Sequence, residues 1–410
     1  MTITSLRGWL KDPETPAGEK ALYAAVALTF FSLPLGTAPS ILAGALSLAI
    51  WLFSGMAIKK RRIYLMPYWW PVFALMLLPW IGMFYTQDTT GIGMDYAEKT
   101  YYWLFGMSVA AISFQYFSAS RLVQAFMLGL GINVFAAIVQ MVFHLNDKYG
   151  HHRGLGPDYS TLSAYLIVGI MMAVFFLNRQ NVMKIRIAIV GLIALYFFHF
   201  VILQSRASYI AFIILVPFIG YTFFRRHKLI KTVALCILIP CLMSLSPIVR
   251  DRAALTVKQV AHHLSAKDGS AWGERYSVQQ DRFYMWNRAL KIIAGNPLIG
   301  VGTGGYSTVL QREGSDPGAP MIAHPHNNVL YMGVSFGVIG IAVLFWFLAV
   351  TLLNGWRRRK TASGYMLLSV VSVMTVTGFF NTQMLDVGTA FLLSLTVGLR
   401  PALEWSHRNG

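Results

Sequence analysis

The sequence predicts an all-α integral membrane protein with about twelve transmembrane helices, and three observations lead to this fold class. Of the 410 residues, 56% are hydrophobic and only 12% are charged, whereas soluble domains are about 45–50% apolar and about 25% charged. Apolar stretches long enough to cross a bilayer follow one another along the chain. Basic residues gather in every second connection between these stretches.

Twelve stretches meet the requirement of roughly 20 mostly apolar residues for each crossing. The first twenty residues carry both signs of charge and lack a short cleavable apolar core. We therefore expect no removable signal peptide, and the first stretch serves as an uncleaved anchor. The twelve stretches lie near residues 21–37, 39–57, 63–85, 101–118, 122–143, 160–177, 187–204, 208–224, 231–248, 327–354, 363–380 and 386–402.

The distribution of charge predicts the orientation, because Lys and Arg accumulate in cytoplasmic loops. With both termini inside, the cytoplasmic segments hold 21 of the 34 basic residues and 4 acidic ones, against 13 basic and 12 acidic residues outside. A basic chain is also typical of nucleic-acid binding. Here the charges lie in short loops that flank the spans, so we expect anionic membrane lipids as partners and no nucleic acid.

The connections divide the chain into three parts. One exterior connection, between the ninth and tenth stretches, is much longer than the others, and connections of that length are usually functional or folded. The predicted parts are residues 1–248 with transmembrane helices 1–9, residues 249–325 as an exterior loop domain, and residues 326–410 with helices 10–12 and a cytoplasmic tail.

The long exterior loop is predicted to contain short helices. Trp286, Leu290 and Ile293 recur at helical spacing, and Arg282 lies on the same side. This pattern is typical of an amphipathic helix near the bilayer surface.

The segment GVGTGG, residues 300–305, satisfies the GxGxxG pattern of dinucleotide-binding loops. It follows Asn296 and Pro297 in the exterior loop, without the strand, crossover helix and ribose-binding acid that such a site needs. The alternative, which we favour, is a tight turn that returns the chain to the membrane.

The segment HPH, residues 324–326, precedes the tenth apolar stretch. Imidazole is a common zinc ligand, but no HExxH motif or His/Asp cluster accompanies the two histidines, and the nearest acid is Asp316. The chain also lacks the DxD pair with which nucleotide-sugar enzymes hold divalent ions. We therefore expect no metal and no other cofactor.

Helical geometry predicts which way the side chain of His326 points. Pro325 is suited to open a helix, which would leave His326 in the first turn. Gly333, Gly337 and Gly340 then lie near one line with His326, and a stripe of small residues lets another helix approach. His326 would face the bundle at the exterior membrane boundary; the simpler alternative is a solvated histidine at the start of a span.

Three arginines lie on the same predicted side of the membrane. Arg206 is in LQSRASY, the tight turn between the seventh and eighth stretches, where a charge is costly and is usually kept for a site or a partner. The alternative is an arginine that extends to lipid headgroups. Arg153 in HHRGLGPDYS and Arg282 add two more guanidinium groups, whose forks match the oxygens of a diphosphate.

These motifs resemble the bacterial O-antigen ligase and O-antigen polymerase superfamily. The resemblance covers roughly residues 150–380, and the first four stretches agree only in hydropathy. SRAS is similar to the family's SRG segment, with Ala207 in place of the commoner glycine. The other matching positions are His326, Asn327, Gly337 and Gly340 of the HN and GxxG hallmark, and Arg282, Trp286, Pro297, Gly300 and Gly302 of its arginine, tryptophan and PxxGxG block.

The resemblance implies a GT-C-type glycosyltransferase of the bacterial inner membrane, with cytoplasmic termini and a periplasmic active site. A ligase of this kind transfers a polymerised glycan from undecaprenyl diphosphate to a sugar hydroxyl of the lipid A core. A polymerase uses another lipid-linked glycan as the acceptor. Twelve spans with one dominant late exterior loop resemble the ligase more.

The chemistry of such a transfer assigns roles to the candidate residues. A sugar hydroxyl needs a base, and the leaving diphosphate needs its growing charge stabilised. We expect His326 to be the base and Arg206 and Arg282 to hold the diphosphate and keep the imidazole neutral. Transfer would then be inverting and metal-independent. The expected substrate-binding residues are Arg153, Asn327, His324 and Trp286, and the sequence leaves the roles of His151, His152 and His324 open.

A transporter or flippase of lipid-linked sugars is the alternative from another class. It would need polar groups near the midplane of several spans and internal repeats. The candidate residues gather at one face instead, which favours an enzyme.

Overall fold

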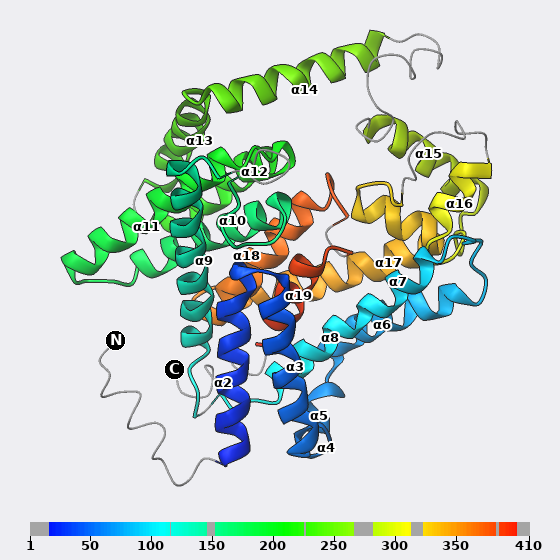
Figure 1. Cartoon of the computed structure of the whole chain (residues 1–410), viewed down its shortest axis with the longest axis horizontal. Coiled ribbons are helices and arrows are strands. Elements are labelled where there is room, and N and C mark those ends of the chain that lie inside the picture. Colours follow the sequence, from blue (N-terminus) through cyan, green and yellow to red (C-terminus); the bar gives the residue numbers. More distant parts are fainter. Residues whose placement is uncertain are drawn as a thin grey trace.

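The computed structural model describes residues 16–114, 116–145, 152–224, 227–265, 282–312, 323–382 and 385–399. These residues form helices joined by turns, with no strand among them, so the all-α prediction is confirmed (Figure 1). The helices are α2 (Ala17–Ser32), α3 (Thr37–Phe53), α4 (Met56–Lys59), α5 (Arg61–Tyr64), α6 (Trp70–Met83), α7 (Ile92–Glu98), α8 (Tyr102–Ala110), α9 (Ala119–Val142), α10 (Tyr159–Leu177), α11 (Met183–Ile202), α12 (Arg206–Phe223), α13 (Lys228–Ser244), α14 (Pro247–Ser265), α15 (Arg282–Gly295), α16 (Gly305–Arg312), α17 (Asn328–Arg357), α18 (Ala362–Thr377) and α19 (Val387–Gly398), with the 3-10 turns η1 (Leu33–Leu35), η2 (Pro67–Trp69) and η3 (Lys99–Tyr101).

Each of the twelve predicted stretches contains one of these helices, but the helices differ in length. Within the described residues, α9, α10, α11, α12 and α17 are long and apolar enough to cross a membrane. A sixth span results if α13 and the adjoining part of α14, which bend by 98°, are taken together. Helices α3, α18 and α19 are apolar but shorter. A membrane protein is therefore supported, and the number of twelve spans stays a prediction.

The centre of the bundle is formed by α10 and α18, which pack on each other and on α9 and α12 (Figure 1). Nearly every residue of α10 is buried. Large apolar side chains are exposed on the outer helices α11 and α13, among them Ile187, Leu229 and Ile237. Apolar groups on both the inside and the outside of a bundle are expected where the surrounding solvent is lipid.

The two ends of the central helices form two separate polar regions. Helices α10, α12 and α17 begin at the end where α18 stops, and Asn328 N–H donates to the carbonyl of Gly378 over 2.7 Å. At the other end, the hydroxyls of Thr222 on α12 and Tyr365 on α18 lie 3.0 Å apart. The same bundle therefore positions one polar group of residues at each end.

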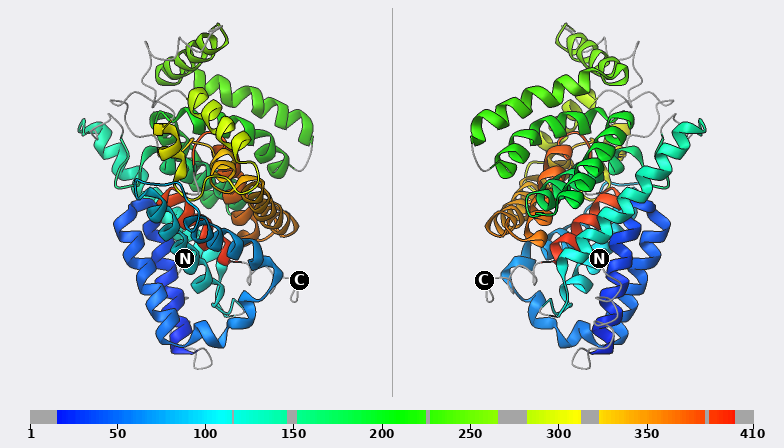
Figure 2. Two further views of the ribbon diagram at one scale, coloured as in Figure 1. Left: turned by 90° about the vertical axis from the view of Figure 1, so that its right-hand side faces the viewer. Right: turned by 90° about the vertical axis from the view of Figure 1, so that its left-hand side faces the viewer.

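Helix α15 confirms the helix predicted in the exterior loop, and the face that it buries inside the protein lies one residue before the apolar face predicted to lie near the bilayer surface. Met285, Ala289 and Ile292 are buried, whereas Leu290 is 57% exposed. The reason is that the chain after α15 folds back and covers the other face. Val301, Tyr306, Leu310 and Val334 form this covering cluster with α15. Figure 2 shows α15 and α16, in yellow, beside α17 in orange.

The glycine-rich segment 300–305 docks on a break in α17. The backbone of α17 leaves the helical conformation at Gly337, with φ of 61°. The carbonyl of Val334 accepts a hydrogen bond from Val301 N–H (2.8 Å), and the carbonyl of Ser335 accepts one from Gly302 N–H (3.0 Å). The loop thus supplies donors that the broken helix lacks, which is a structural role for GxGxxG.

Close approach explains the glycines of this contact. Gly300 has φ of +67°, and a Cβ there would lie 2.3 Å from the carbonyl oxygen of Val334. Gly337 is approached by the backbone of Leu298 and Ile299. The prediction that Gly337 admits a neighbouring helix is therefore wrong, because a loop fills that position; at Gly333 the neighbour is Ile293 of α15.

Candidate active site

His326 lies immediately before α17 rather than in its first turn, so that prediction is wrong. Helix α17 begins at Asn328, and the side chain of Asn327 accepts Leu330 N–H over 3.0 Å as the N-cap. Asn is among the best N-cap residues, and the helix therefore starts after it rather than at Pro325. His326 has φ of 50°, in the left-handed region. Such a conformation is uncommon for a residue other than glycine and often occurs at functional sites.

The ring of His326 is oriented by Asn381, which lies in the connection between α18 and α19. Nδ1 of His326 is 3.2 Å from Oδ1 of Asn381. The same oxygen accepts Thr382 N–H over 2.9 Å, and the amide Nδ2 donates to Ser160 Oγ over 3.1 Å. The backbone donor requires an acceptor at that position, which fixes the amide orientation. Nδ1 must therefore carry the proton, and Nε2 keeps its lone pair.

His324 is the second imidazole of the cluster. Its Nδ1 lies 3.0 Å from the Thr382 hydroxyl, and its ring centroid is 4.4 Å from that of His326. Burial, followed by the His326 and Lys99 charges, lowers the pKa of His324 to about 3. Burial also lowers the pKa of His326, with the Arg282 charge acting in the same direction against the Asn381 hydrogen bond. Both rings are neutral at physiological pH.

Arg282 reaches the same connection from α15. Its guanidinium donates to the carbonyl of Phe380, the residue directly before Asn381. Burial is the main cause that lowers the pKa of Arg282, yet a guanidinium remains charged at neutral pH. The α18–α19 connection thus brings together the two predicted catalytic groups His326 and Arg282.

Arg206, the first residue of α12, lies within electrostatic reach of Arg282 and Tyr159. Arg252 on α14 also lies within electrostatic reach of Arg206, and its Nη2 donates to Gln204 Oε1 over 2.5 Å. Sequence reasoning missed Arg252. The only available signal was a basic residue directly after the ninth apolar stretch, in a loop where several others are present.

The other residues predicted to bind substrate make contacts within the protein. The carbonyl of Arg153 accepts a hydrogen bond from Asn133 on α9 over 3.1 Å. Asn327 caps α17, and its Nδ2 donates to the carbonyl of Phe379 over 3.0 Å. The ring of Trp286 packs on that of Phe283, with centroids 5.8 Å apart. These contacts are structural, so the substrate-binding roles of Arg153, Asn327 and Trp286 stay predictions.

Two further histidines were left open by the sequence. The carbonyl of His152 accepts a hydrogen bond from Nε2 of His199 over 2.9 Å, which ties the loop before α10 to α11. His151 lies outside the described residues.

Several helices begin at the cluster. Arg206 and Arg282 open α12 and α15, and Asp158 caps α10 by accepting the N–H groups of Ser160 and Thr161. The N-terminus of a helix carries partial positive charge. Together with the arginines, these ends make the region favourable for an anionic group.

Two carboxylates adjoin this positive region and were also missed. The hydroxyl of Thr161 lies within hydrogen-bond distance of a carboxylate oxygen of Asp158 and of one of Asp386, which links the starts of α10 and α19. The two acids lie far apart in the sequence, so only the packing of α10 against α19 reveals the pair.

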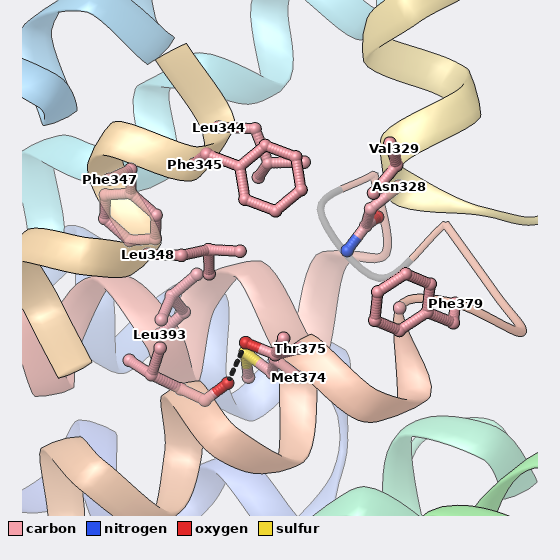
Figure 3. Close-up of a pocket in the computed structure, with 12 residues that line it drawn as sticks. Asn328, Val329, Leu344, Phe345, Phe347, Leu348, Met374, Thr375, Phe379 and Leu393 are labelled. Atoms are coloured by element: carbon pink, nitrogen blue, oxygen red, sulfur yellow. Dashed lines mark hydrogen bonds between the residues drawn. The ribbon is translucent and has the colours of Figure 1, made fainter. Parts of the chain in front are cut away.

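Two hollows have lining residues that are close in sequence to the cluster. A polar hollow of about 430 Å³ is bounded by Ala323, directly before His324, and by α7 and the start of α8. Its polar lining residues are Asp95, Tyr96, Glu98, Lys99, Tyr101 and Tyr102. A narrow apolar pocket of about 40 Å³ lies between α17, α18 and α19, where Figure 3 shows Asn328 and Phe379 at one side.

The region has few groups suited to hold a metal ion. In the part of the chain that the structure describes, no three His, Cys, Asp or Glu side chains lie together as ligands. The cationic groups around it include the guanidinium ions of Arg206, Arg252 and Arg282 and the ammonium group of Lys99.

Residues 191–345 match the family model described as O-antigen ligase. This match over part of the chain supports membership in the O-antigen ligase and polymerase superfamily. It confirms the resemblance inferred from the motifs. No curated protein matches the chain.

The O-antigen ligase match contains the residues that the structure brings together from the loop and the flanking helices, namely Arg206, Arg252, Arg282, His324 and His326. Asn381 and Thr382, which orient the two histidines, lie after its end. An O-antigen ligase domain implies a glycosyltransferase-like role in O-antigen processing, with a lipid-linked glycan and a lipid acceptor as substrates. With the apolar helices, it also indicates a multi-pass inner-membrane protein.

Proposed function

We propose that the protein is an O-antigen ligase that transfers a polymerised glycan from undecaprenyl diphosphate to a sugar hydroxyl of the lipid A core. The observation that carries this proposal is the contact between Nδ1 of His326 and Oδ1 of Asn381, from which the tautomer of His326 is inferred. Asn381 occupies Nδ1, and Nε2 is left as a neutral proton acceptor next to Arg282. A neutral base beside fixed positive charge is the combination that an alcohol nucleophile and a diphosphate leaving group require.

In the proposed reaction, Nε2 of His326 takes the proton of the acceptor hydroxyl. The oxygen attacks the anomeric carbon from the side opposite the diphosphate, and the bond between that carbon and the diphosphate oxygen breaks. Arg206 and Arg282 stabilise the charge that develops on the leaving diphosphate. A single displacement inverts the anomeric configuration and needs neither a covalent glycosyl-enzyme nor a metal.

The polar hollow beside His324 and the apolar pocket beside Phe379 match the chemistry of the proposed acceptor and donor. Tyrosine rings and carboxylates, as found in the polar hollow beside His324, can stack on sugar rings and accept their hydroxyls. We assign this hollow to the acceptor. The apolar pocket beside Phe379 lies next to the Phe380 carbonyl that holds Arg282, so an amphipathic donor could keep its prenyl chain in an apolar environment and its diphosphate at the arginines.

We also propose the arrangement in the membrane. The twelve predicted spans, of the GT-C type, would place residues 1–248 and 326–410 as transmembrane parts and residues 249–325 as a periplasmic domain. Both termini would be cytoplasmic and the His326 cluster periplasmic. The excess of basic residues at the opposite end of the bundle supports this orientation.

The test uses His326→Ala in cells that make a polymerised O-antigen. The ligase proposal predicts lipopolysaccharide with bare core while polymerised glycan accumulates on undecaprenyl diphosphate. His326→Gln should fail as well, because an amide cannot take the proton. His227→Ala, an exposed histidine at the start of α13, is the control and should leave the ladder normal.

The other functions give different results in the same gel and lipid extract. A polymerase variant would leave single repeat units on the core and no long lipid-linked chains. Loss of a flippase would prevent exposure of lipid-linked units at the periplasmic face. A normal long-chain ladder in His326→Ala would exclude His326 from catalysis.

A further inference from the structure

A second polar cavity lies at the end of the bundle opposite the His326 cluster. It has a volume of about 270 Å³ and is formed where α10 and α12 end and α13 begins. The connection between α17 and α18 closes it. Its cationic lining residues are Arg179, Lys228, Arg359 and Lys360, and Phe175, Tyr221, Phe223 and Tyr365 supply aromatic walls.

The charge around this cavity is of one sign. The described segments that surround it, residues 178–184, 221–224, 227–231 and 356–365, contain eight basic residues and no acidic one. No Asp or Glu is among the described lining residues either. Like charges held close together repel one another, so an anion bound there would be stabilised.

The cationic groups are held in place by neighbouring groups. The guanidinium of Arg179 lies 3.6 Å from the ring centroid of Phe175, and its Nη2 donates to the carbonyl of Lys360 over 2.7 Å. Arg359 lies 4.2 Å from the ring centroid of Trp356, and its Nη1 donates to the carbonyl of that residue over 2.9 Å. Stacked guanidinium groups lose little further freedom when they bind an anion.

We propose that this cavity binds the phosphate of an anionic phospholipid headgroup. Phosphate oxygens match two guanidinium forks and an ammonium group. The cavity borders an apolar outer surface, where Tyr221, Leu229 and Ile230 are exposed. Acyl chains can lie on that surface while the headgroup enters the cavity, which favours a lipid over free phosphate.

This inference does not depend on the proposed enzymatic activity. Helix α10 has 19 residues, and at 1.5 Å for each residue it separates its two ends by about 28 Å. A lipid at Arg179 therefore cannot be the substrate at His326. If the His326 cluster is periplasmic, the lipid belongs to the cytoplasmic leaflet.

The test measures lipid retention by native mass spectrometry of the purified full chain in detergent, with added phosphatidylglycerol, cardiolipin or phosphatidylcholine. The double variant Lys228→Gln/Arg359→Gln should retain phosphatidylglycerol and cardiolipin roughly 25-fold more weakly than the wild type, about fivefold for each charge. Arg61→Gln/Arg62→Gln on α5 removes two charges outside the cavity and should retain them normally. Phosphatidylcholine should bind all three proteins alike.

Two results would overturn the assignment. Equal loss of anionic lipid in both double variants would show only a general attraction between charges. Displacement of the lipid by millimolar inorganic phosphate at constant ionic strength would assign the cavity to free phosphate instead. His326→Ala provides the comparison with catalysis, because it should abolish transfer and leave lipid retention unchanged.

Discussion

The side-chain oxygen of Asn381 lies 3.2 Å from Nδ1 of His326. That oxygen also accepts a backbone hydrogen bond from Thr382, so it cannot exchange places with the amide nitrogen without facing a donor. In the proposed mechanism Asn381 is a positioning residue, which holds the proton on Nδ1 and leaves Nε2 to act as the base.

The pH dependence of transfer follows from this contact. A base is active in its neutral form, and the pKa of His326 is lowered mainly by burial, so the acid limb of the wild-type rate should lie below pH 6.5. Asn381→Asp keeps the acceptor and adds a negative charge, which raises the pKa of His326 and should move the acid limb up by about one pH unit. Initial rates of glycan transfer between pH 5 and 8 measure this shift.

Asn381→Leu provides the second arm of this experiment, because it removes the acceptor. It should reduce kcat by about tenfold or more, while the KM for the lipid-linked donor stays close to that of the wild type. Asn354→Asp on α17, whose amide Nδ2 donates to the Val350 carbonyl, adds the same charge far along the helix and should leave the pH profile unchanged. An unshifted acid limb in Asn381→Asp would show that the contact with His326 does not tune the base.

Arg206 and Arg282 should tolerate no change to lysine. Lysine keeps the charge but loses the planar fork that matches a diphosphate. Each variant should lower the transfer rate by about 100-fold, as the loss of one charge-stabilising donor typically does, with normal amounts of protein in the membrane. Arg250→Lys on α14 is exposed and serves as the control. Full activity in both variants would contradict the diphosphate role and favour the alternative that Arg206 and Arg282 extend to lipid headgroups.

Gly300 should be required for stability rather than for chemistry. Gly300→Ala places a Cβ against the Val334 carbonyl at a positive φ. The expected cost is about 1–3 kcal/mol, visible as a lower Tm of the purified protein. Gly295→Ala, with open space around its Cβ, should leave the Tm unchanged or slightly raised. An unchanged Tm in Gly300→Ala would show that the loop is not held on α17 in this way.

The orientation of the two polar ends can be tested with single cysteines. Thr90, near the glycine loop, and Asn181, between α10 and α11, are both exposed. In a chain whose Cys236 and Cys241 are replaced by serine, Thr90→Cys should react with an impermeant maleimide in intact spheroplasts. Asn181→Cys should react only after permeabilisation. Reaction of both from one side would refute the twelve-span arrangement.

The sequence by itself determined the fold class, the family and most of the reactive groups. Helix formation and apolar composition are local properties, so every predicted apolar stretch contains a helix of the structure. Basic residues and histidines carry their chemistry wherever they lie, and Arg206, Arg282 and His326 could be named before any contact was known. All three lie within the matched residues 191–345, and their roles stay predictions.

Tertiary structure alone decided how these groups act. The start of α17 depends on which residue caps the helix. Asn327 is the cap, so His326 lies outside the helix and its ring contacts Asn381. The buried face of α15 shifted by one residue because a returning loop covered it. Arg252, Asn381 and the Asp158–Asp386 pair lie on segments that are distant in sequence and meet only through helix packing. A sequence read locally specifies which side chains are available, but their distances, burial and tautomers arise from contacts between elements that the local pattern does not encode.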